Sequence, residues 1–429
     1  MGVFQSLAVP GDKSITHRLL ILAALARGES RIAGALTSLD IKSTARILRS
    51  LGARITPLTA GEVVRVGGNG AFRSPGRPLD CGNSGTTARL SLGALVAHPF
   101  EATLTGDASL RRRPMRRVTE PLERMGARFS GSNLDRLPLS VRGGKLVPIE
   151  WEMPVSSAQI KGSILFAGVA AGCPVAVREP TGRSRDHTER LLRAFGFTVT
   201  EDDGGWVRFR PDGRLEPFEL DVPGDASSAA FLVGAGLVRS HGVVGIAGVG
   251  VNPTRTGFLR VLERMGARVI LENVRDAGGE PVADLITGPA ELQATTVSEA
   301  EIPSLIDEIP LLAVVAARAR GVSRFLEVGE LRVKESNRLA LLAENLRAVG
   351  VEATASEDTL EVEGTDRAPR GRIRTDGDHR IAMAFAVLGL VGGAAIQVDD
   401  LQCAAVSFPG FDRVLGSLKQ GRRRSAAPR

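Results

Sequence analysis

The hydrophobic positions of this chain form a pattern that returns about every seventy residues. A helical run ends in Leu-x-x-x-Gly, and a strand with alternating apolar and polar residues follows it. Each of these glycines stands where the end of a helix needs a left-handed residue, so the pattern predicts a helix C-terminus before it suggests any chemistry. The five copies end at Gly52, Gly126, Gly196, Gly266 and Gly350.

A second and more apolar helix is predicted upstream of each copy, and a sixth near the end of the chain. Short strands follow these helices, as at 101–105, 175–177 and 242–246. The pattern therefore predicts six units, each with strand, helix, strand, helix and two strands, which is an α/β (α+β) fold. We expect the strand 6–9 to complete the sixth unit, which otherwise ends near Leu418. The predicted apolar helices cover residues 14–26, 86–97, 158–171, 227–237, 306–317 and 379–390.

Two matching Pro-Gly-Asp segments indicate how the units divide into domains. A chain of 429 residues is longer than one core usually supports. The segments at 10–12 and 223–225 occupy equivalent points of the repeat, so we interpret them as a two-strand hinge. The predicted domains, of three units each, are 1–10 plus 225–429, which contains both termini, and an inserted domain 11–224. Residues 419–429 are expected to form a flexible basic tail.

Composition limits the class of protein. The chain is 43% hydrophobic and 24% charged, and its three cysteines lie too far apart for a disulfide framework or a Cys-rich zinc site. No secretion signal is indicated at the start, so a cytoplasmic location is expected. The apolar run 381–398 contains glycines and Gln397, so a buried helix and strand are expected there, and no membrane interaction. The five histidines have no metal-ligand spacing, and we expect neither metal nor cofactor.

Cations and hydroxyls gather where the predicted helices begin. Unpaired backbone N–H groups and the helix dipole favour an anion there, and phosphate is the usual one. A formal net charge of +7 fits acidic small molecules. Single positions are weak evidence, because such residues are most often N-caps or solvated charges, but their recurrence at one structural position is stronger. The positions are Lys13, Ser14, Arg18, Gly85, Arg113, Ser157, Gln159, Arg185, Lys334, Arg338 and Arg380.

Two acidic residues stand among these cations. Asp307 lies between apolar segments, so its carboxylate needs a partner or a task, and we favour a functional role over a buried N-cap. Glu335 stands between Lys334 and Arg338, which are expected on one face of a helix, and could equally be a salt-bridge partner.

Together these segments resemble the 3-phosphoshikimate 1-carboxyvinyltransferase family, also called 5-enolpyruvylshikimate-3-phosphate synthases, over essentially the whole chain. The resemblance implies two domains of three βαβαββ units, the inside-out α/β barrel of the enolpyruvyl transferases, with the active site in a cleft between them. The matching segments are Gly11-Asp-Lys-Ser-Ile-Thr-His-Arg18, Gly82-Asn-Ser-Gly-Thr-Thr87, Arg113-Pro-Met115, Ser157-Ala-Gln159, Ser184-Arg-Asp-His-Thr188, Gly224-Asp-Ala-Ser-Ser228, Arg332-Val-Lys-Glu-Ser-Asn-Arg338 and Asp378-His-Arg380.

The resemblance also implies an activity in aromatic amino acid biosynthesis. The enolpyruvyl group of phosphoenolpyruvate would pass to the 5-hydroxyl of shikimate 3-phosphate, with Asp307 taking the hydroxyl proton and Glu335 or Lys13 protonating the methylene carbon. Shikimate 3-phosphate would be held by Lys13, Ser14, Arg18, Ser157, Gln159, Arg185, Asp307 and Lys334. Phosphoenolpyruvate would be held by Lys13, Gly85, Arg113, Gln159, Arg338 and Arg380.

Two positions bear on differences within the family. Some members carry a lysine that contacts phosphoenolpyruvate just before the Phe-Pro turn, where this chain has Val406 and Ser407. Gly85 is retained where glyphosate-tolerant members of the same branch carry alanine. We therefore expect glyphosate to inhibit this protein in competition with phosphoenolpyruvate.

Two alternatives stay open at this stage. A sister family transfers the enolpyruvyl group to UDP-N-acetylglucosamine, but it uses a Lys-Asn pair and a reactive loop cysteine, whereas this chain has Lys13-Ser14 and an Arg111-Arg-Arg-Pro-Met115 stretch. Repeats of this kind could also bind nucleic acid, which the absence of tyrosine and of a basic stretch interleaved with aromatics disfavours. The expected partners are small molecules only, and a monomer is expected.

Overall fold

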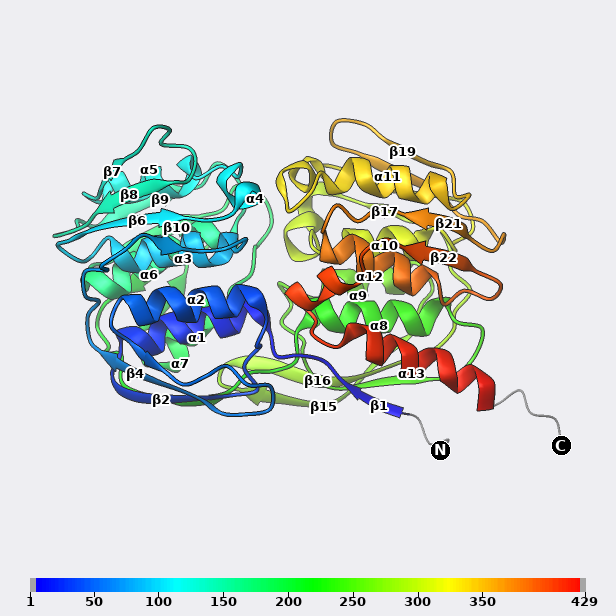
Figure 1. The fold of residues 1–429 in the computed structure, drawn as a ribbon, viewed down its shortest axis with the longest axis horizontal. Coiled ribbons are helices and arrows are strands. Elements are labelled where there is room, and N and C mark those ends of the chain that lie inside the picture. Colours follow the sequence, from blue (N-terminus) through cyan, green and yellow to red (C-terminus); the bar gives the residue numbers. More distant parts are fainter. Residues whose placement is uncertain (1–4, 425–429) are drawn as a thin grey trace. The chain divides into compact units, whose positions relative to one another are not determined.

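The computed structural model describes residues 5–424 and divides into two compact units (Figure 1). The inserted unit comprises residues 11–223 together with 276–280, and the terminal unit comprises 5–10, 224–275 and 281–424. The backbone passes between them at the two predicted crossings, Pro10–Gly11 and Pro223–Gly224, and also on either side of residues 276–280. The hinge that we infer at these two crossings stays a prediction. The predicted basic tail 419–429 lies partly outside the described residues, because α13 (Phe411–Arg424) continues to Arg424.

The inserted unit contains three four-stranded sheets with one topology. In each sheet the first pair of strands is parallel and the other two pairs are antiparallel. The sheets are β13 (Glu219–Asp221), β2 (Arg27–Ala33), β4 (Val64–Asn69) and β3 (Arg54–Ile55); β5 (Leu79–Asp80), β6 (Glu101–Thr105), β8 (Leu139–Arg142) and β7 (Arg128–Ser130); and β9 (Ile149–Glu152), β10 (Val175–Arg178), β12 (Trp206–Arg210) and β11 (Thr198–Glu201).

Each sheet is accompanied by two longer helices, of which the first is the more apolar. The apolar helices α1 (Lys13–Leu25), α3 (Gly85–Leu95) and α6 (Ala158–Ala171) are buried over most of their length, which explains why their sequences lack a polar face. The second helices are α2 (Leu39–Ser50), α5 (Arg116–Arg124) and α7 (His187–Ala194), and the short α4 (Ala108–Arg111) precedes α5.

The terminal unit repeats this arrangement around α8 (Ala226–Val238), α10 (Ile309–Ala316) and α12 (His379–Leu388). The second helices are α9 (Gly257–Arg264), α11 (Arg338–Ala348) and α13, and the 3-10 helices are η1 (Glu299–Ser304), η2 (Gly329–Val333) and η3 (Gln402–Val406). The sheets are β1 (Gln5–Ala8), β14 (Val244–Gly250), β16 (Glu280–Thr287) and β15 (Val269–Ala277); β17 (Thr296–Val297), β18 (Val322–Phe325), β20 (Leu360–Glu363) and β19 (Ala353–Ala355); and β21 (Arg370–Ile373) with β22 (Ala395–Val398).

The expected place of the N-terminal strand is wrong. Strand β1 pairs in parallel with β14, Gln5 opposite Val244, so it completes the first sheet of the terminal unit. The sixth sheet contains only β21 and β22. The order of strands explains the difference, because β1 takes the edge position in the terminal unit that β13 takes beside β2 in the inserted unit.

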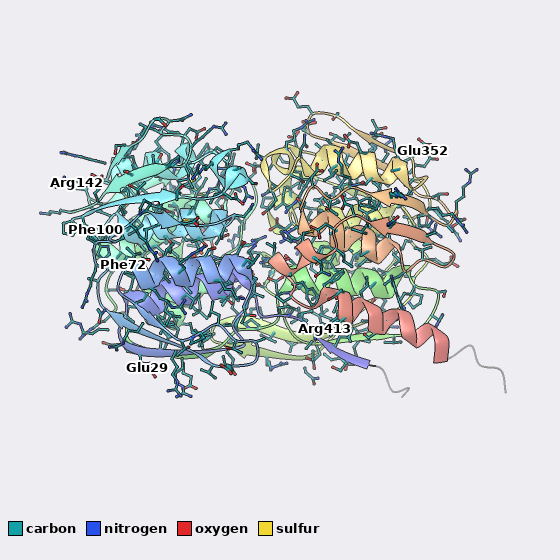
Figure 2. All side chains as sticks on the ribbon, in the orientation of Figure 1. Glu29, Phe72, Phe100, Arg142, Glu352 and Arg413 are labelled. Atoms are coloured by element: carbon teal, nitrogen blue, oxygen red, sulfur yellow. The ribbon has the colours of Figure 1, made fainter. Side chains whose placement is uncertain are left out.

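The local signals of the repeat are confirmed. All five repeat glycines have positive φ, between +85° and +113°, as a left-handed helix end requires. The apolar run 381–398 forms the buried helix that was expected, α12, but the expectation of a buried strand is wrong, because β22 alternates exposed and half-buried residues. Among the described residues, no helix is both long enough and apolar enough to cross a membrane. Exposed charged side chains such as Glu29, Arg142 and Glu352 lie toward the outside of their units (Figure 2).

Candidate active site

The N-terminus of α1 carries the first group of predicted site residues. Asp12 caps the helix, since its carboxylate accepts the Ile15 N–H at 2.9 Å. Lys13 follows, and its Nζ lies 2.5 Å from Asp40 Oδ2 at the beginning of α2. The lysine is therefore paired with a carboxylate and lies beside a helix start, where an anion is also attracted.

Arg18 lies one turn further along α1 and is almost fully buried. Its Nε donates to Thr188 Oγ1 at 2.7 Å, one Nη donates to the Ser14 carbonyl at 2.9 Å, and the other donates to the Ala158 carbonyl at 3.3 Å. Burial lowers the pKa of Arg18 to about 10, so the guanidinium stays protonated at neutral pH. Arg185 donates to Ser14 Oγ at 3.3 Å, so the beginnings of α1, α6 and α7 meet around these arginines.

A second group forms where α3 begins. Gly85 is the first residue of this helix, and a Cβ there would lie 2.9 Å from Arg89 Nη1 and 3.4 Å from Arg113 Nη1. Arg113 donates to Asn83 Oδ1 at 2.6 Å, and Arg89 donates to Gln159 Oε1 at 2.6 Å. Gly85, Arg113 and Gln159 are thus brought together. Arg89 joins them, although no role was predicted for it.

The predicted residues of the terminal unit surround Arg338, the first residue of α11. This side chain is 1% exposed, and its Nε lies 2.8 Å from Asp378 Oδ2. Its Nη1 is 3.5 Å from Asp307 Oδ1, and its Nη2 bonds to Glu335. Burial alone would raise the pKa of Asp378, but the guanidinium outweighs it and holds that pKa below its ordinary value. One buried cation therefore organises three carboxylates.

Asp307 also contacts Arg380, the second residue of α12. The Asp307 carbonyl accepts from Arg380 Nη1 at 2.9 Å, and Arg380 Nη2 lies 3.6 Å from Asp307 Oδ2. Lys334 belongs to the same neighbourhood: burial lowers the pKa of its ammonium, and the charge of Asp307 opposes that change. Because Asp307 retains 15% exposure, its carboxylate can still meet a ligand.

Two expectations about this group are wrong in detail. Asp307 does not lie in a helix, because α10 begins at Ile309 with Glu308 as the capping position. Lys334 and Arg338 do not share a helix face, because Lys334 follows η2 with an extended backbone and α11 begins at Arg338. Asn337 provides the cap, with its side chain accepting the Ala340 N–H at 3.2 Å. The cluster is therefore held by turns that precede two helices.

The predicted residues thus form one cluster within each unit. The inserted unit holds Lys13, Ser14, Arg18, Gly85, Arg113, Ser157, Gln159 and Arg185, and the terminal unit holds Asp307, Lys334, Glu335, Arg338 and Arg380. Across residues 5–424, no group of three or more His, Cys, Asp or Glu side chains is arranged to hold a metal ion.

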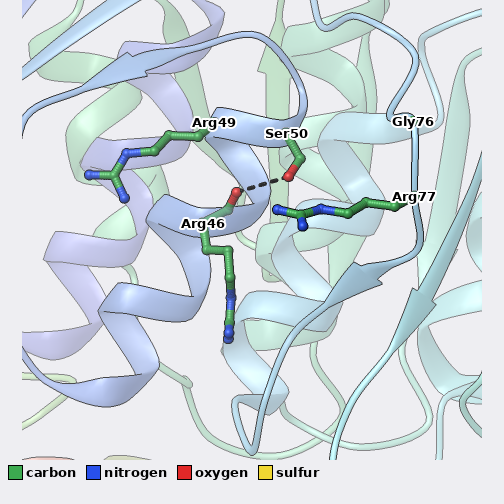
Figure 3. Close-up of a pocket in the computed structure, with 5 residues that line it drawn as sticks. All are labelled: Arg46, Arg49, Ser50, Gly76 and Arg77. Carbon is green, nitrogen blue, oxygen red and sulfur yellow. Dashed lines mark hydrogen bonds between the residues drawn. The ribbon is translucent and has the colours of Figure 1, made fainter.

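A separate open pocket lies on α2 and the segment before β5 of the inserted unit (Figure 3). Its lining includes Arg46, Arg49, Ser50 and Arg77, none of which is a predicted site residue. Arg46 donates to Ser43 Oγ at 3.0 Å, and Arg49 donates to the Thr56 carbonyl at 2.8 Å. Since two of the three guanidiniums already have protein acceptors, we assign no ligand to this pocket.

Cys81 and Cys173 lie in surroundings that favour the protonated thiol. Burial raises the pKa of Cys81 to about 12, and burial likewise raises the pKa of Cys173. Both thiols therefore stay protonated at neutral pH, which disfavours either as the reactive cysteine of the sister family.

Comparison with solved structures defines the class of protein. The enolpyruvyl transferase NikO from Streptomyces tendae is 17% identical, yet the match has a TM-score of 0.77 and covers 97% of this chain and 94% of that chain. EPSP synthase from Acinetobacter baumannii is 38% identical with a TM-score of 0.85, covering 96% of this chain and 95% of that one. The fold is the inside-out α/β fold of the enolpyruvyl transferases.

Sequence comparison defines the family. The model for EPSP synthase (3-phosphoshikimate 1-carboxyvinyltransferase) matches residues 3–415. Proteins named 3-phosphoshikimate 1-carboxyvinyltransferase from Gloeobacter violaceus and Desulforudis audaxviator are 48% identical over 417 residues and 46% identical over 414, and each match covers 96% of both chains. The chain belongs to the EPSP synthase family.

Proposed function

We propose that this chain transfers the enolpyruvyl group of phosphoenolpyruvate to the 5-hydroxyl of shikimate 3-phosphate and releases inorganic phosphate. The observation that carries the proposal is the placement of Asp307, a partly exposed carboxylate between Arg338 and Arg380. Cations next to a carboxylate are what this reaction needs, since anionic substrates must be held while one hydroxyl loses a proton.

The cations divide by their proposed ligands. Shikimate 3-phosphate would be bound by Arg18, Arg185 and Lys334 with the polar groups of Ser14, Ser157 and Gln159. Phosphoenolpyruvate would be bound by Arg113, Arg338 and Arg380 beside Gly85. Lys13 would contact both substrates. Their phosphates and carboxylates repel one another, and charge-assisted hydrogen bonds from these side chains offset that repulsion.

The proposed chemistry has two steps. In the first, Asp307 accepts the proton of the 5-hydroxyl, Glu335 or Lys13 gives a proton to the methylene carbon, and the new C–O bond forms a tetrahedral phospho-ketal. In the second, the bond to phosphate breaks and the methyl group loses a proton, which restores the double bond. No covalent bond to the protein is required.

A monomeric enzyme that acts in the cytoplasm on small molecules belongs to the same proposal. The lack of a basic stretch interleaved with aromatic residues supports small-molecule substrates over nucleic acid.

Phosphate release tests the proposal. Purified protein would be given phosphoenolpyruvate with shikimate 3-phosphate, shikimate or UDP-N-acetylglucosamine as parallel acceptors. We expect release with shikimate 3-phosphate alone. Release with the nucleotide sugar would favour the sister activity, and a lack of release with every acceptor would contradict both.

Asp307→Ala is expected to lower turnover by at least ~100-fold while shikimate 3-phosphate still binds, because a general base contributes about 10²–10⁴-fold. Asp366→Ala, at an exposed aspartate of the same unit, provides the matched control. Near-normal turnover in Asp307→Ala would remove this residue from the mechanism.

A further inference from the structure

A buried lysine lies behind the helix starts of the inserted unit. Lys161, in the first turns of α6, is 2% exposed, and its Nζ is 2.8 Å from Glu179 Oε2 and 2.7 Å from Glu189 Oε1. The proposed chemistry uses none of these three residues. Burial would lower the pKa of Lys161, but the two carboxylates raise it above its ordinary value, so the ammonium stays charged.

Stability alone is a poor reason for such a cluster. Desolvating a lysine and two carboxylates costs several kcal/mol per ion, and well-packed apolar side chains often replace buried ion pairs without loss. The neighbouring contacts show instead what the charges hold in place.

One side of the cluster fixes the segment before α7. Lys161 Nζ lies 3.3 Å from the Ser184 carbonyl, and Glu179 Oε2 accepts the Ser184 N–H at 3.1 Å. Both backbone polar groups of Ser184 are therefore held by this ion pair. The next residue is Arg185, whose guanidinium reaches Ser14 at the beginning of α1.

The other side of the cluster reaches Arg18. Glu189 follows Thr188 in α7, and Thr188 Oγ1 accepts from Arg18 Nε. The charge of Glu189 also opposes the effect of burial on the pKa of Arg18. Gly162, next to Lys161, permits this approach, because a Cβ there would lie 3.1 Å from Thr188 Oγ1 and 3.4 Å from Arg18 Nη2.

We propose that Lys161 is a positioning residue for the acceptor substrate: through Glu179 it places Arg185, and through Glu189 it places Thr188 and hence Arg18. It contacts no substrate itself. The inference rests on the proposed function, in which Arg18 and Arg185 bind shikimate 3-phosphate. It follows that losing Lys161 weakens binding of the acceptor more than binding of phosphoenolpyruvate.

Lys161→Met tests the inference, since methionine keeps most of the length and removes the charge. We expect the KM for shikimate 3-phosphate to rise at least ~10-fold, the order expected when a charge-assisted contact is misplaced, with the KM for phosphoenolpyruvate changed less than about threefold. Lys145→Met, at an exposed lysine of the same unit, should leave both values unchanged.

A merely structural role would give a different result. It would reduce the fraction of active enzyme, and so the apparent kcat, while both KM values stayed at their wild-type levels. That result, or an equal rise in both KM values, would overturn the inference. Titration of active sites and thermal unfolding of each variant separate these cases.

Unpaired buried carboxylates could prevent Lys161→Met from folding. In that case Glu179→Ala tests the inference instead. The Glu179 side chain is 10% exposed, and its loss removes the acceptor of the Ser184 N–H while Lys161 keeps its ion pair with Glu189. It should raise the KM for shikimate 3-phosphate selectively, and unchanged kinetics would contradict the inference. Wild-type protein that released no phosphate with shikimate 3-phosphate would overturn the proposed function and the inference together. If the wild type is active but neither variant raises the KM for shikimate 3-phosphate selectively, only the inference is overturned.

Discussion

Gly85 is the first residue of α3. The guanidiniums of Arg89 and Arg113 lie next to the position that a Cβ of this residue would occupy. Arg89 is itself held by Gln159 and by the Pro114 carbonyl at 3.0 Å, so it has little freedom to withdraw from an added methyl group. Gly85→Ala is expected to displace Arg89 and Arg113 and raise the KM for phosphoenolpyruvate about tenfold, the effect of weakening one or two charged hydrogen bonds.

Steady-state kinetics with each substrate varied would measure this change, and inhibition by glyphosate should weaken with it. Gly76→Ala is the matched control, because a Cβ there meets nothing within 4 Å. If Gly85→Ala bound phosphoenolpyruvate as tightly as the wild type, the proposed position of this ligand beside α3 would be wrong.

Single residues also show where inference from sequence ends. Arg89 follows Gly85 by four positions, which is as typical of an ordinary helix surface as of a site, and only the fold shows it buried against Gln159. The sequence shows Lys161 near the start of a helix but does not show its partners. Glu179 follows the end of β10 and Glu189 lies in α7, so only the fold brings them to the lysine. Contacts across elements carry the missing information.

At the level of elements, a chain of polar groups links three helices of the inserted unit. His17 on α1 is fully buried, and its Nδ1 lies 2.7 Å from Thr44 Oγ1 on α2, which is 2.7 Å from Thr87 Oγ1 on α3. Burial, and to a smaller extent the charges of Lys13 and Arg18, lower the pKa of His17 well below its ordinary value. Below about pH 6.5, the pKa of an unfolded-state histidine, the unfolded chain gains a proton at His17 and the folded protein does not. The free energy of unfolding therefore has the full contribution of His17 above that pH and loses it as the pH falls further.

The stability of the inserted unit should accordingly fall between pH 7 and pH 5, with a contribution from His17 of up to ~1.4 kcal/mol per pH unit. Chemical unfolding of wild type and His17→Gln across this range would measure it, and the variant should show a shallower slope. His241→Gln, at an exposed histidine, should keep the wild-type slope. His98 adds to the fall in stability at low pH, because burial lowers its pKa too. Its ring contacts those of Phe72 and Phe100, which are labelled in Figure 2. Equal slopes in wild type and His17→Gln would contradict the assignment.

Helices were predictable where apolar periodicity and a closing glycine agreed. α6 occupies the predicted range, and α1 and α3 begin one residue early. The predicted helix 306–317 is present as α10, but its predicted start is wrong. The helix begins at Ile309, with Pro310 in the first turn, a position that suits a residue without an N–H group. Asn337 is a typical N-cap residue and would have predicted that α11 begins at Arg338. The prediction relied instead on the spacing of Lys334 and Arg338.

At the level of the whole molecule, the inserted unit has the marks of an independent folding unit. Its apolar core draws only on residues between Ile15 and Val222, and the Asp12 N–H donates to the Pro223 carbonyl at 2.8 Å, so its two ends are adjacent. A fragment of residues 11–223 is therefore expected to unfold cooperatively on its own.

The fragment should be less stable than the same unit in the full chain, because it lacks residues 276–280. In that segment Glu280 lies 2.7 Å from His187 Nδ1, and the Gly279 carbonyl accepts from Arg190 at 3.0 Å. Circular dichroism during urea unfolding would test both points. The counterpart 224–429 lacks β1 and serves as the comparison. A fragment 11–223 without a cooperative transition would contradict the expectation.

The overall architecture was predictable from the sequence because the repeat was, but the pairing of β1 was not. Strand β1 could pair with β14 or join the sheet of β21 and β22, and the choice depends on which sheet has an unpaired edge strand. A strand of four residues carries no sequence signal for a partner so far along the chain. The same holds for 276–280, which group with a unit whose other residues end at Pro223.

The pairing of β1 with β14 also sets an order of events on the ribosome. The first strand to leave the exit tunnel finds its partner only when residues 244–247 have been made, after the whole of 11–223 has been made. At about 5–20 residues per second, β1 waits roughly 10–50 s, by which time all of the inserted unit except residues 276–280 has been made. During translation the nascent chain therefore carries the inserted unit without residues 276–280, together with one unpaired strand, β1. The brevity of β1, four residues, limits how well a neighbouring nascent chain could pair with it during that wait.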